Sequence, residues 1–264
     1  MKISIAQIIA LTSYGNAFLK GQSVSFDFSH STAKHCKKIT FIEWPGGDVL
    51  ADNPNEWFEF LKTNQVNSLF LDFAPAEDTI KETREAMGFI GGGGRWLISA
   101  IKGENAEVWE GRWSSPNEKT SENELWTVNY GRIAKEWSLP STDKLPTLAQ
   151  AKKNLKNALD EIISFSQAQK LDEFTKSFES ALNCISSNNP FNGLYHQDLI
   201  VKDNYTLEAK QLLAACQAAF VFGAMASWND MTYEGTTQES YDKLSDNLFF
   251  SIIESICIAI NSFP

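Results

Sequence analysis

The spacing of hydrophobic positions changes near the middle of the chain. In the first part, compact apolar runs alternate with short amphipathic stretches, and an apolar run of strand length bounded by polar residues is typical of β-structure. The runs predict two strands followed by an antiparallel meander of three. They lie at 37–44, 68–73, 95–101, 106–113 and 125–134. Between the first two meander strands, Gly103 suits the positive φ of a tight turn.

Helix signals lie before and between these runs. Asn53, Pro54 and Glu56 form, in order, an N-cap, a first helical residue and the partner in a capping box, which predicts a helix after the first strand. The segment 75–88 begins with proline, is rich in acids at its start and ends in glycine, which predicts a second helix. The spacing of isoleucines at the amino terminus predicts an amphipathic helix that ends at Gly21.

From Thr147 onward, apolar residues recur every three or four positions, which is typical of helices packed on one face. Thr147 and Gln150 form a capping box at the start of this part, and Thr236 and Glu239 form another before the last repeat. These patterns predict a helical second half. The apolar repeats lie at 148–162, 171–185, 212–223 and 241–260.

The strand-length apolar runs of the first part and the helical spacing of the second together predict an α+β fold. We expect a mixed or antiparallel N-terminal sheet with flanking helices over 1–138, followed by an α-helical region over 139–264. The segment 138–147 has two prolines and few apolar residues, as linkers do. The sequence leaves open whether the two regions are fused into one domain.

The net charge of the chain indicates which kinds of molecule it can bind. The 264 residues include 23 Lys and Arg against 33 Asp and Glu, a net charge of -10. Such a field repels phosphate backbones and anionic lipids and attracts a basic protein, so we expect a protein partner, no nucleic acid and no membrane. No apolar run approaches the roughly 18 residues that would span a bilayer.

Cysteine usage indicates the compartment. Cys36, Cys184, Cys216 and Cys257 are scattered with no Cys-x-x-Cys pair, so we expect free thiols and a reducing cytoplasm. The amino terminus has a lysine and an apolar stretch, as a signal peptide does. Gln7 interrupts that stretch and no small-x-small cleavage motif follows, so a folded helix is the better interpretation.

Four consecutive glycines at 91–94 resemble a phosphate-binding loop. Such loops follow a strand and precede a helix, whereas here a predicted helix precedes the glycines and a predicted strand follows them. We interpret the run as a joint between helix and sheet, with the rim of a binding surface as the alternative.

Residues for catalysis or metal binding are scarce. His30 and His35 lie with Cys36 in a polar loop, short of the four paired donors usual for zinc, and the third histidine is His196. His35 and Cys36 are adjacent, and neighbours on an extended chain point apart, so they do not form a nucleophile and its base. No Gly-x-Ser-x-Gly motif occurs. We therefore expect no metal, no cofactor and no catalytic residue.

Aromatic residues and arginines alternate along the predicted meander. Trp109 and Trp113 share one side of their strand, as Trp126, Tyr130 and Arg132 do on the next. Such stripes are either a core packed under helices or a recognition face, since Trp, Tyr and Arg dominate interface energetics. Arginines beside tryptophan favour recognition because guanidinium stacks on aromatic rings. The candidate binding residues are Arg95, Trp96, Arg112, Trp113, Tyr130 and Arg132.

A second candidate region lies at 222–235. Trp228 and Asp230 stand where a helix should end, with Glu234 close behind. They favour a capped turn anchored by the tryptophan, but two carboxylates near a tryptophan are also an arrangement used in glycan chemistry. Trp228, Asp230 and Glu234 therefore join the candidate binding residues. Asp72, at the end of a predicted strand, is a further candidate carboxylate.

Binding without catalysis is the function that the sequence favours. A compact acidic protein suits the role of an immunity protein or antitoxin, which neutralises a basic toxin by electrostatically steered capture. The alternative is an enzyme that acts on a polar small molecule or a glycan through paired carboxylates such as Asp72, Asp230 and Glu234. A deep pocket where two carboxylates converge would favour the enzyme, and a broad aromatic or acidic patch would favour the protein partner.

Overall fold

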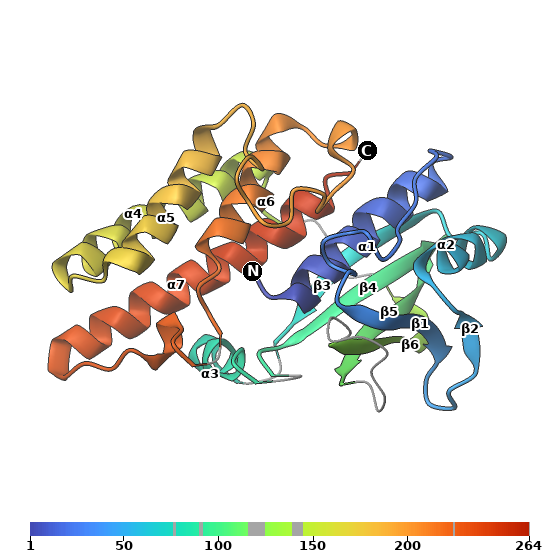
Figure 1. Ribbon diagram of the computed structural model, residues 1–264, viewed down its shortest axis with the longest axis horizontal. Helices are drawn as coiled ribbons and strands as arrows, with labels where there is room; N and C mark the ends of the chain where they lie inside the picture. Colours follow the sequence, from blue (N-terminus) through green and yellow to red (C-terminus); the bar gives the residue numbers. More distant parts are fainter. Residues whose placement is uncertain (76–77, 90–91, 116–124, 139–144, 224, 264) are drawn as a thin grey trace.

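A computed structural model of the protein describes residues 1–75, 78–89, 92–115, 125–138, 145–223 and 225–263. Within these residues the chain forms a six-stranded sheet and seven α-helices (Figure 1). The strands are β1 (Cys36–Glu43), β2 (Val49–Ala51), β3 (Ser68–Ala74), β4 (Arg95–Lys102), β5 (Asn105–Ser114) and β6 (Trp126–Ser138). The helices are α1 (Ile3–Leu19), α2 (Pro54–Thr63), α3 (Ile80–Ala86), α4 (Leu148–Ala168), α5 (Asp172–Ser186), α6 (Leu207–Ala219) and α7 (Gly235–Ile260).

The sheet is mixed, with strand order β2-β1-β6-β5-β4-β3. Strands β3 to β6 form an antiparallel meander, and Gly103, at φ 61°, turns the chain between β4 and β5 as predicted. β1 runs parallel to β6 and antiparallel to β2. The predicted fold class, an N-terminal sheet with flanking helices followed by a helical half, is confirmed.

The elements lie in layers around α1. α1 and α2 cover one face of the sheet, and α4 to α7 pack together on the far side of α1 (Figure 1). α7 runs the length of the helical layer and also reaches β3 and α3. As a result, α1 has the sheet on one side and the C-terminal helices on the other.

The surroundings of α1 correct the prediction of an amphipathic helix. The helix forms, but polar residues along it are buried together with the isoleucines. Gln7 is fully buried and donates from Nε2 to the carbonyl oxygen of Thr32 at 2.9 Å. Thr12 donates to the carbonyl oxygen of Ile8 at 2.8 Å. Because the polar side chains find partners inside the protein, α1 has no face that must meet water.

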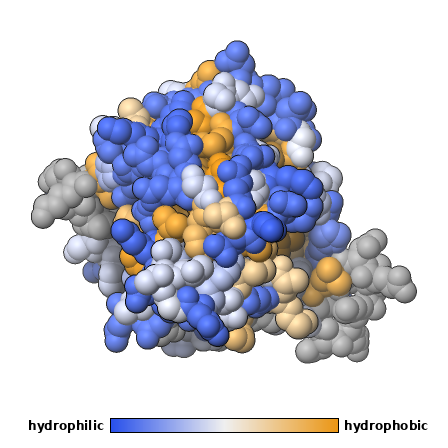
Figure 2. Space-filling model, turned by 90° about the vertical axis from the view of Figure 1, so that its left-hand side faces the viewer, coloured by the Kyte–Doolittle hydropathy of each residue, from blue (hydrophilic) through white to orange (hydrophobic). Residues whose placement is uncertain are grey.

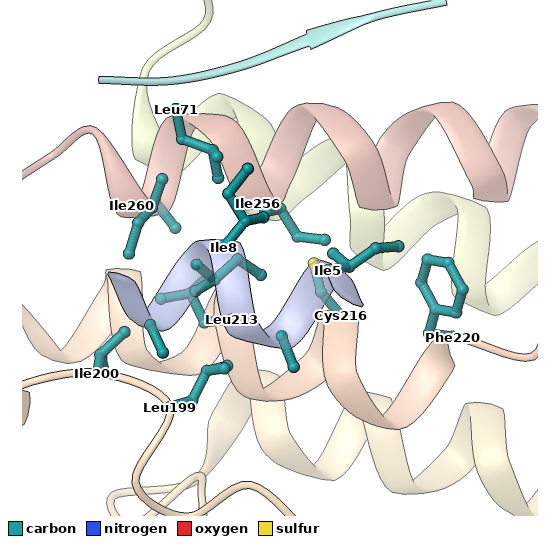
Figure 3. Packing of buried hydrophobic residues seen from close by; sticks show 14 of the residues in the cluster. Ile5, Ile8, Leu71, Leu199, Ile200, Leu213, Cys216, Phe220, Ile256 and Ile260 are labelled. Carbon is teal, nitrogen blue, oxygen red and sulfur yellow. The ribbon is translucent and has the colours of Figure 1, made fainter. Parts of the chain in front are cut away.

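The hydrophobic core is one contiguous cluster that includes residues of both regions. Figure 3 shows Ile5 and Ile8 of α1 between α6, which supplies Leu213 and Cys216, and α7, which supplies Ile256. Each fully buried side chain of this size contributes roughly 1.5–3 kcal/mol by leaving water. α1 thereby ties the helical layer to the sheet.

Two predicted helix starts are confirmed by their caps. The Asn53 side chain accepts from the backbone N–H of Glu56 at 3.0 Å, at the start of α2. The Thr147 hydroxyl accepts from the backbone N–H of Gln150 at 3.2 Å, at the start of α4. In both cases a local sequence signal suffices because the cap satisfies a backbone donor that the helix itself cannot pair.

Two other predicted starts are wrong. α3 begins after Thr79, whose capping box with Glu82 lies downstream of the proline at 75 that was predicted to start it. α7 begins at Gly235 with no side-chain cap, so Thr236 and Glu239 lie inside the helix. Most of the linker predicted at 138–147 falls outside the described residues.

Candidate binding groove

An open groove of about 810 Å³ lies where the first turn of α1, the connection from α3 to β4 and one end of the helix-covered sheet face meet. A second, more open hollow of about 620 Å³ lies beside Phe174, Phe220 and Val221. Figure 2, which views the molecule from the left-hand side of Figure 1, shows apolar surface in a central band between hydrophilic side chains. The groove residues used below are Lys2, Phe89, Arg95, Trp96, Glu110, Arg112, Trp113, Trp126 and Tyr130.

The aromatic stripes of the meander run from the core into this groove. Trp109 is fully buried under α2, and its ring lies 5.5 Å from that of Trp57. Further along the same face, Trp96, Trp113 and Trp126 are only partly buried and line the groove. The sheet face is therefore core at one end and accessible aromatic surface at the other.

Trp113 and Trp126 form a pair on neighbouring strands. Their rings make an edge-to-face contact with centroids 5.8 Å apart. Beneath them, Tyr130 is almost fully buried and donates from its hydroxyl to Oε1 of Gln7 at 3.1 Å. Burial raises the pKa of Tyr130 well above its usual value, so it remains a neutral donor. Tyr130 thus contributes a rigid floor to the groove.

A cluster of charges lies at the same end of the sheet, on the face opposite to Trp113 and Tyr130. Arg95 donates from Nε and Nη2 to the two carboxylate oxygens of Glu110, at 2.7 and 2.9 Å. Arg112 approaches the same carboxylate at 3.6 Å and stacks over the ring of Trp44 at 3.8 Å. The two arginine side chains are about half exposed, at 48% and 44%, whereas that of Glu110 is 16% exposed. The arginines therefore present charge to the solvent while the carboxylate lies behind them.

The glycines at 92–94 provide the joint that the sequence predicted, and residue 91 lies outside the described residues. Gly93 and Gly94 have φ of 82° and 96°, which favours glycine over any other residue. A Cβ at Gly93 would collide with the side chain of Met87, and one at Gly94 with the ring of Phe73. Gly92 and Gly94 also line the groove, so the segment is both a joint and part of the rim.

Four of the candidate binding residues lie away from the groove. Arg132 donates to Glu107 at 2.9 Å and to Glu43 at 2.5 Å, with its side chain 10% exposed, and lies over the rings of Phe60 and Trp109. These contacts hold it in place under α2. It stabilises the edge of the core and presents little surface to a partner.

Trp228, Asp230 and Glu234 belong to the helical layer. Trp228 is fully buried and donates from Nε1 to the hydroxyl of Ser245 at 2.7 Å. Asp230 accepts from the backbone N–H of Ser227 at 3.1 Å in a capping box. Glu234 is exposed just before α7. The interpretation of this segment as a capped turn anchored by tryptophan is confirmed.

Lys2, Phe89 and Glu110 line the groove but were not among the residues predicted from the sequence. Lys2 donates to the carbonyl oxygen of Met87, which is 85 residues further along the chain. Burial lowers the pKa of Lys2. Phe89 is 71% exposed in the connection to β4. Neither position is part of a periodic pattern. Glu110 was missed as well, although its place between Arg95 and Arg112 on neighbouring strands offered a charge-pairing signal.

A polar cluster at the other side of α1 joins two loops. Ser31 donates from its backbone N–H to Asp198 at 2.8 Å and from its hydroxyl to the other oxygen of the same carboxylate. Nδ1 of His196 lies 2.8 Å from that hydroxyl oxygen. Because the single hydroxyl proton goes to Asp198, Nδ1 of His196 must donate and cannot serve as a base toward Ser31. The cluster is therefore a structural contact that holds the loop at Ser31 against the loop at 196–198.

The carboxylates of the enzyme alternative do not converge. Asp72 accepts from the hydroxyl of Ser99 at 3.4 Å, and burial raises its pKa. Asp230 and Glu234 lie in the turn before α7. No hydrogen bond links any two of the three within the described residues. In that same part of the chain, no group of three or more His, Cys, Asp or Glu side chains is placed to hold a metal ion.

Comparisons with known proteins return no match to any family model, curated protein or solved structure. Among the described helices, none combines the length and apolar character needed to cross a bilayer. The groove and its chemistry are therefore the main indication of function.

Proposed function

We propose that the chain is a non-catalytic binding protein that holds a segment of another protein in the groove. The observation that carries this proposal is the wall formed by Trp96, Trp113 and Trp126, which the fold leaves only partly buried around one hollow. Tryptophan and arginine are the residues that carry most of the binding energy in protein interfaces. Leaving three tryptophans partly exposed has a cost in solubility that a bound partner would offset.

Catalysis by paired carboxylates has less support. Among the described residues that line the groove, Glu110 is the single carboxylate, and Arg95 and Arg112 already neutralise it. General acid and base chemistry on a sugar needs two carboxyl groups facing one bond. We therefore retain binding as the function and propose no reaction.

The charge of the whole chain supports a basic partner at long range. A net charge of -10 attracts a basic protein and speeds its encounter, as in complexes of toxins with immunity proteins or antitoxins. Each of the four cysteines is free, which fits a reducing compartment such as the cytoplasm. An immunity protein or antitoxin of the cytoplasm is the class we propose.

The test places a photo-crosslinking benzoylphenylalanine at Phe89, which is 71% exposed beside the groove, and at Phe250 on α7, which is 50% exposed, as the matched control. Both variants are expressed in the native host and irradiated. We expect a defined protein adduct from position 89 and not from position 250. The same adducts from both positions, or none at 89, would contradict the proposal.

A second arm uses the purified partner from that adduct. Trp113→Ala should weaken its binding by more than about tenfold, because it removes an aromatic anchor. Trp137→Ala is the control, since Trp137 is 56% exposed on β6 and does not line the groove. Equal affinities for the two variants would place the interface elsewhere.

A further inference from the structure

We propose that two buried histidines make one contact between loops sensitive to acid. His30 lies in the loop between α1 and β1, and His196 lies in the loop between α5 and α6. Their exposed fractions are 6% and 3%. Near neutral pH, hydrogen bonds between residues 30–32 and residues 196–198 hold the two loops together. In mild acid these bonds open while the surrounding fold stays intact. This inference is independent of the proposed function.

Asp198 receives hydrogen bonds from the first of these loops and from α1. Its carboxylate accepts from the backbone N–H of Ser31 at 2.8 Å and from the hydroxyl of that residue. Its backbone carbonyl oxygen accepts from the hydroxyl of Tyr14 at 3.2 Å and lies 2.9 Å from Nε2 of His30. Nδ1 of His196 lies 2.8 Å from the hydroxyl oxygen of Ser31. Both histidines therefore belong to the same small set of hydrogen bonds that joins the loops.

The hydrogen-bond partners of His30 require its neutral form. A carbonyl oxygen can only accept, so Nε2 must carry the proton that it donates to Asp198. The other ring nitrogen, Nδ1, accepts from the backbone N–H of Thr32 at 3.2 Å and therefore has no proton. In acid a proton is added to Nδ1, where it faces that N–H. Two donors cannot share a hydrogen bond, so protonation of His30 leaves the N–H of Thr32, a fully buried residue, without this acceptor.

Burial and nearby positive charges oppose the protonation of His196. Its Nδ1 already donates to Ser31, so acid adds the second proton at Nε2 and gives the ring a positive charge. The amino terminus and Lys34 repel that charge, as does His30 once it is protonated, whereas the carboxylate of Asp198 attracts it. Burial, aided by the positive groups, outweighs Asp198 and lowers the pKa of His196 to about 4. The ring is therefore neutral near pH 7 in the closed contact.

His30 faces two carboxylates and still resists protonation. Its Nε2 lies 3.8 Å from Oδ2 of Asp198, and Asp27 is a second negative charge. Burial outweighs both, so the pKa of His30 is lowered. The rings of Phe26, stacked at 4.4 Å, and Tyr14, edge-on at 5.2 Å, enclose the imidazole. A histidine released to water regains a pKa of about 6.5, so the open form binds the proton first and is favoured as the pH falls below that value.

Apolar side chains limit how far the two loops can open. Leu199 and Ile200 directly follow Asp198, are 0% and 3% exposed, and belong to the hydrophobic core (Figure 3). Phe26 and Ala33, on either side of the contact in the first loop, are core residues as well. These side chains hold both loops to the core. Acid therefore opens the hydrogen bonds between the loops without unfolding the protein.

Hydrogen exchange of the full chain, measured by mass spectrometry, tests the inference. After correction for the intrinsic effect of pH on exchange, peptides that cover residues 28–34 should lose protection by at least about tenfold between pH 7.5 and pH 5.5. This is the change expected when an opened histidine takes up a proton with a pKa of about 6.5. Peptides that cover residues 66–72, in and before β3, should keep their protection. Equal losses in the two regions would mean that acid unfolds the whole protein, and the inference would be wrong.

The three histidines of the chain supply matched variants. Glutamine at 30 keeps a donor near the position of Nε2, asparagine at 196 keeps one near Nδ1, and neither titrates. His30→Gln combined with His196→Asn should abolish the pH dependence of protection at residues 28–34. His35→Gln, outside this set of hydrogen bonds, should preserve it. Circular dichroism and the thermal midpoint establish that each variant is folded. A pH dependence that survives the double substitution would overturn the inference.

Nitrogen NMR of the unaltered chain provides a measurement that needs no variant. At pH 7.5, His30 should be neutral with its proton on Nε2, and His196 should be neutral with its proton on Nδ1. A charged His30, or one with its proton on Nδ1, would contradict the hydrogen-bond assignment on which the acid sensitivity depends.

Discussion

The Asn16 side chain takes the place of a neighbouring strand for Leu69. Its Nδ2 donates to the carbonyl oxygen of Leu69 at 2.9 Å, and its Oδ1 accepts from the backbone N–H of the same residue at 2.6 Å. Leu69 lies in β3, at the edge of the sheet. Asn261, beyond α7, repeats the arrangement at Leu71 at 2.7 and 2.9 Å. Two amides from distant helices thereby close a strand edge that would otherwise attract another chain.

Replacing Asn16 by leucine should destabilise the protein by about 2–4 kcal/mol, because two buried backbone groups of Leu69 lose their partners. Urea unfolding followed by fluorescence measures the change in free energy. Asn204→Leu is the control, since Asn204 pairs with Gln22 at the exposed surface. If the two variants unfold at the same urea concentration, the edge is satisfied in another way.

Arg84 should be more important for stability than any exposed lysine. Its side chain is 1% exposed and pairs with Asp246 at 2.8 Å and Asn229 at 3.0 Å, which joins α3 to α7. Arg84→Met should cost about 3–5 kcal/mol, because it leaves Asp246 without its partner. Lys81→Met, in a half-exposed ion pair on the same helix, should cost less than about 1 kcal/mol. Equal unfolding free energies would contradict the structural role of Arg84.

His196 should make stability depend on pH between about 6.5 and 4. Burial, aided by the positive charge of the amino terminus, lowers the pKa of His196 to about 4 from an ordinary value of 6.5. A pKa that is lower in the folded state means that the unfolded chain binds the proton first, so this stability is complete above pH 6.5 and is lost as the pH falls. The loss should be about 3 kcal/mol, at about 1.4 kcal/mol for each pH unit between the two pKa values.

His196→Asn provides the check, because asparagine retains a hydrogen-bonding amide near Ser31 but does not titrate. Unfolding free energies measured at several pH values should show a shallower slope for the variant. His30 also has a pKa lowered by burial, so part of the slope should remain. An unchanged slope would show that His196 is not the titrating group.

Gly94→Ala should destabilise the protein more than Gly103→Ala. Both residues have positive φ, 96° and 61°, so both substitutions strain the backbone, by about 1 kcal/mol. A Cβ at Gly94 would also meet the ring of Phe73, whereas nothing lies within 4 Å of one at Gly103. The difference in thermal midpoint measures the added packing cost, about 1–3 kcal/mol. If the two midpoints coincide, the connection from α3 to β4 adapts.

Much of the fold follows from local sequence signals, and its non-local parts do not. Alternation in each meander strand and the caps at Asn53 and Thr147 act within a few residues, so the sequence alone reveals them. The parallel pairing of β1 with β6 joins segments almost a hundred residues apart. β2 is three residues long, too short for a periodic signal. Neither the β1–β6 pairing nor strand β2 can therefore be predicted from the local pattern of hydrophobic residues.

The candidate site was predictable only where it lies on strands. Trp96 and Trp113 were identified because strand periodicity places them on one face. Arg132 has the same chemistry, yet its partners Glu43 and Glu107 are on other strands, and those ion pairs make it structural. Burial depends on which elements meet in space. A residue's type therefore shows what it can bind and leaves open whether it is accessible.

The position of α1 also imposes an order on assembly during synthesis. α1 leaves the ribosome before α6 and α7, which complete its burial site and are made about two hundred residues later. Until then its isoleucines have only part of their burial site, and a nascent chain would expose them to chaperones or to other chains. The emergence of α7 from the ribosome is thus the event that allows α1 to become fully enclosed.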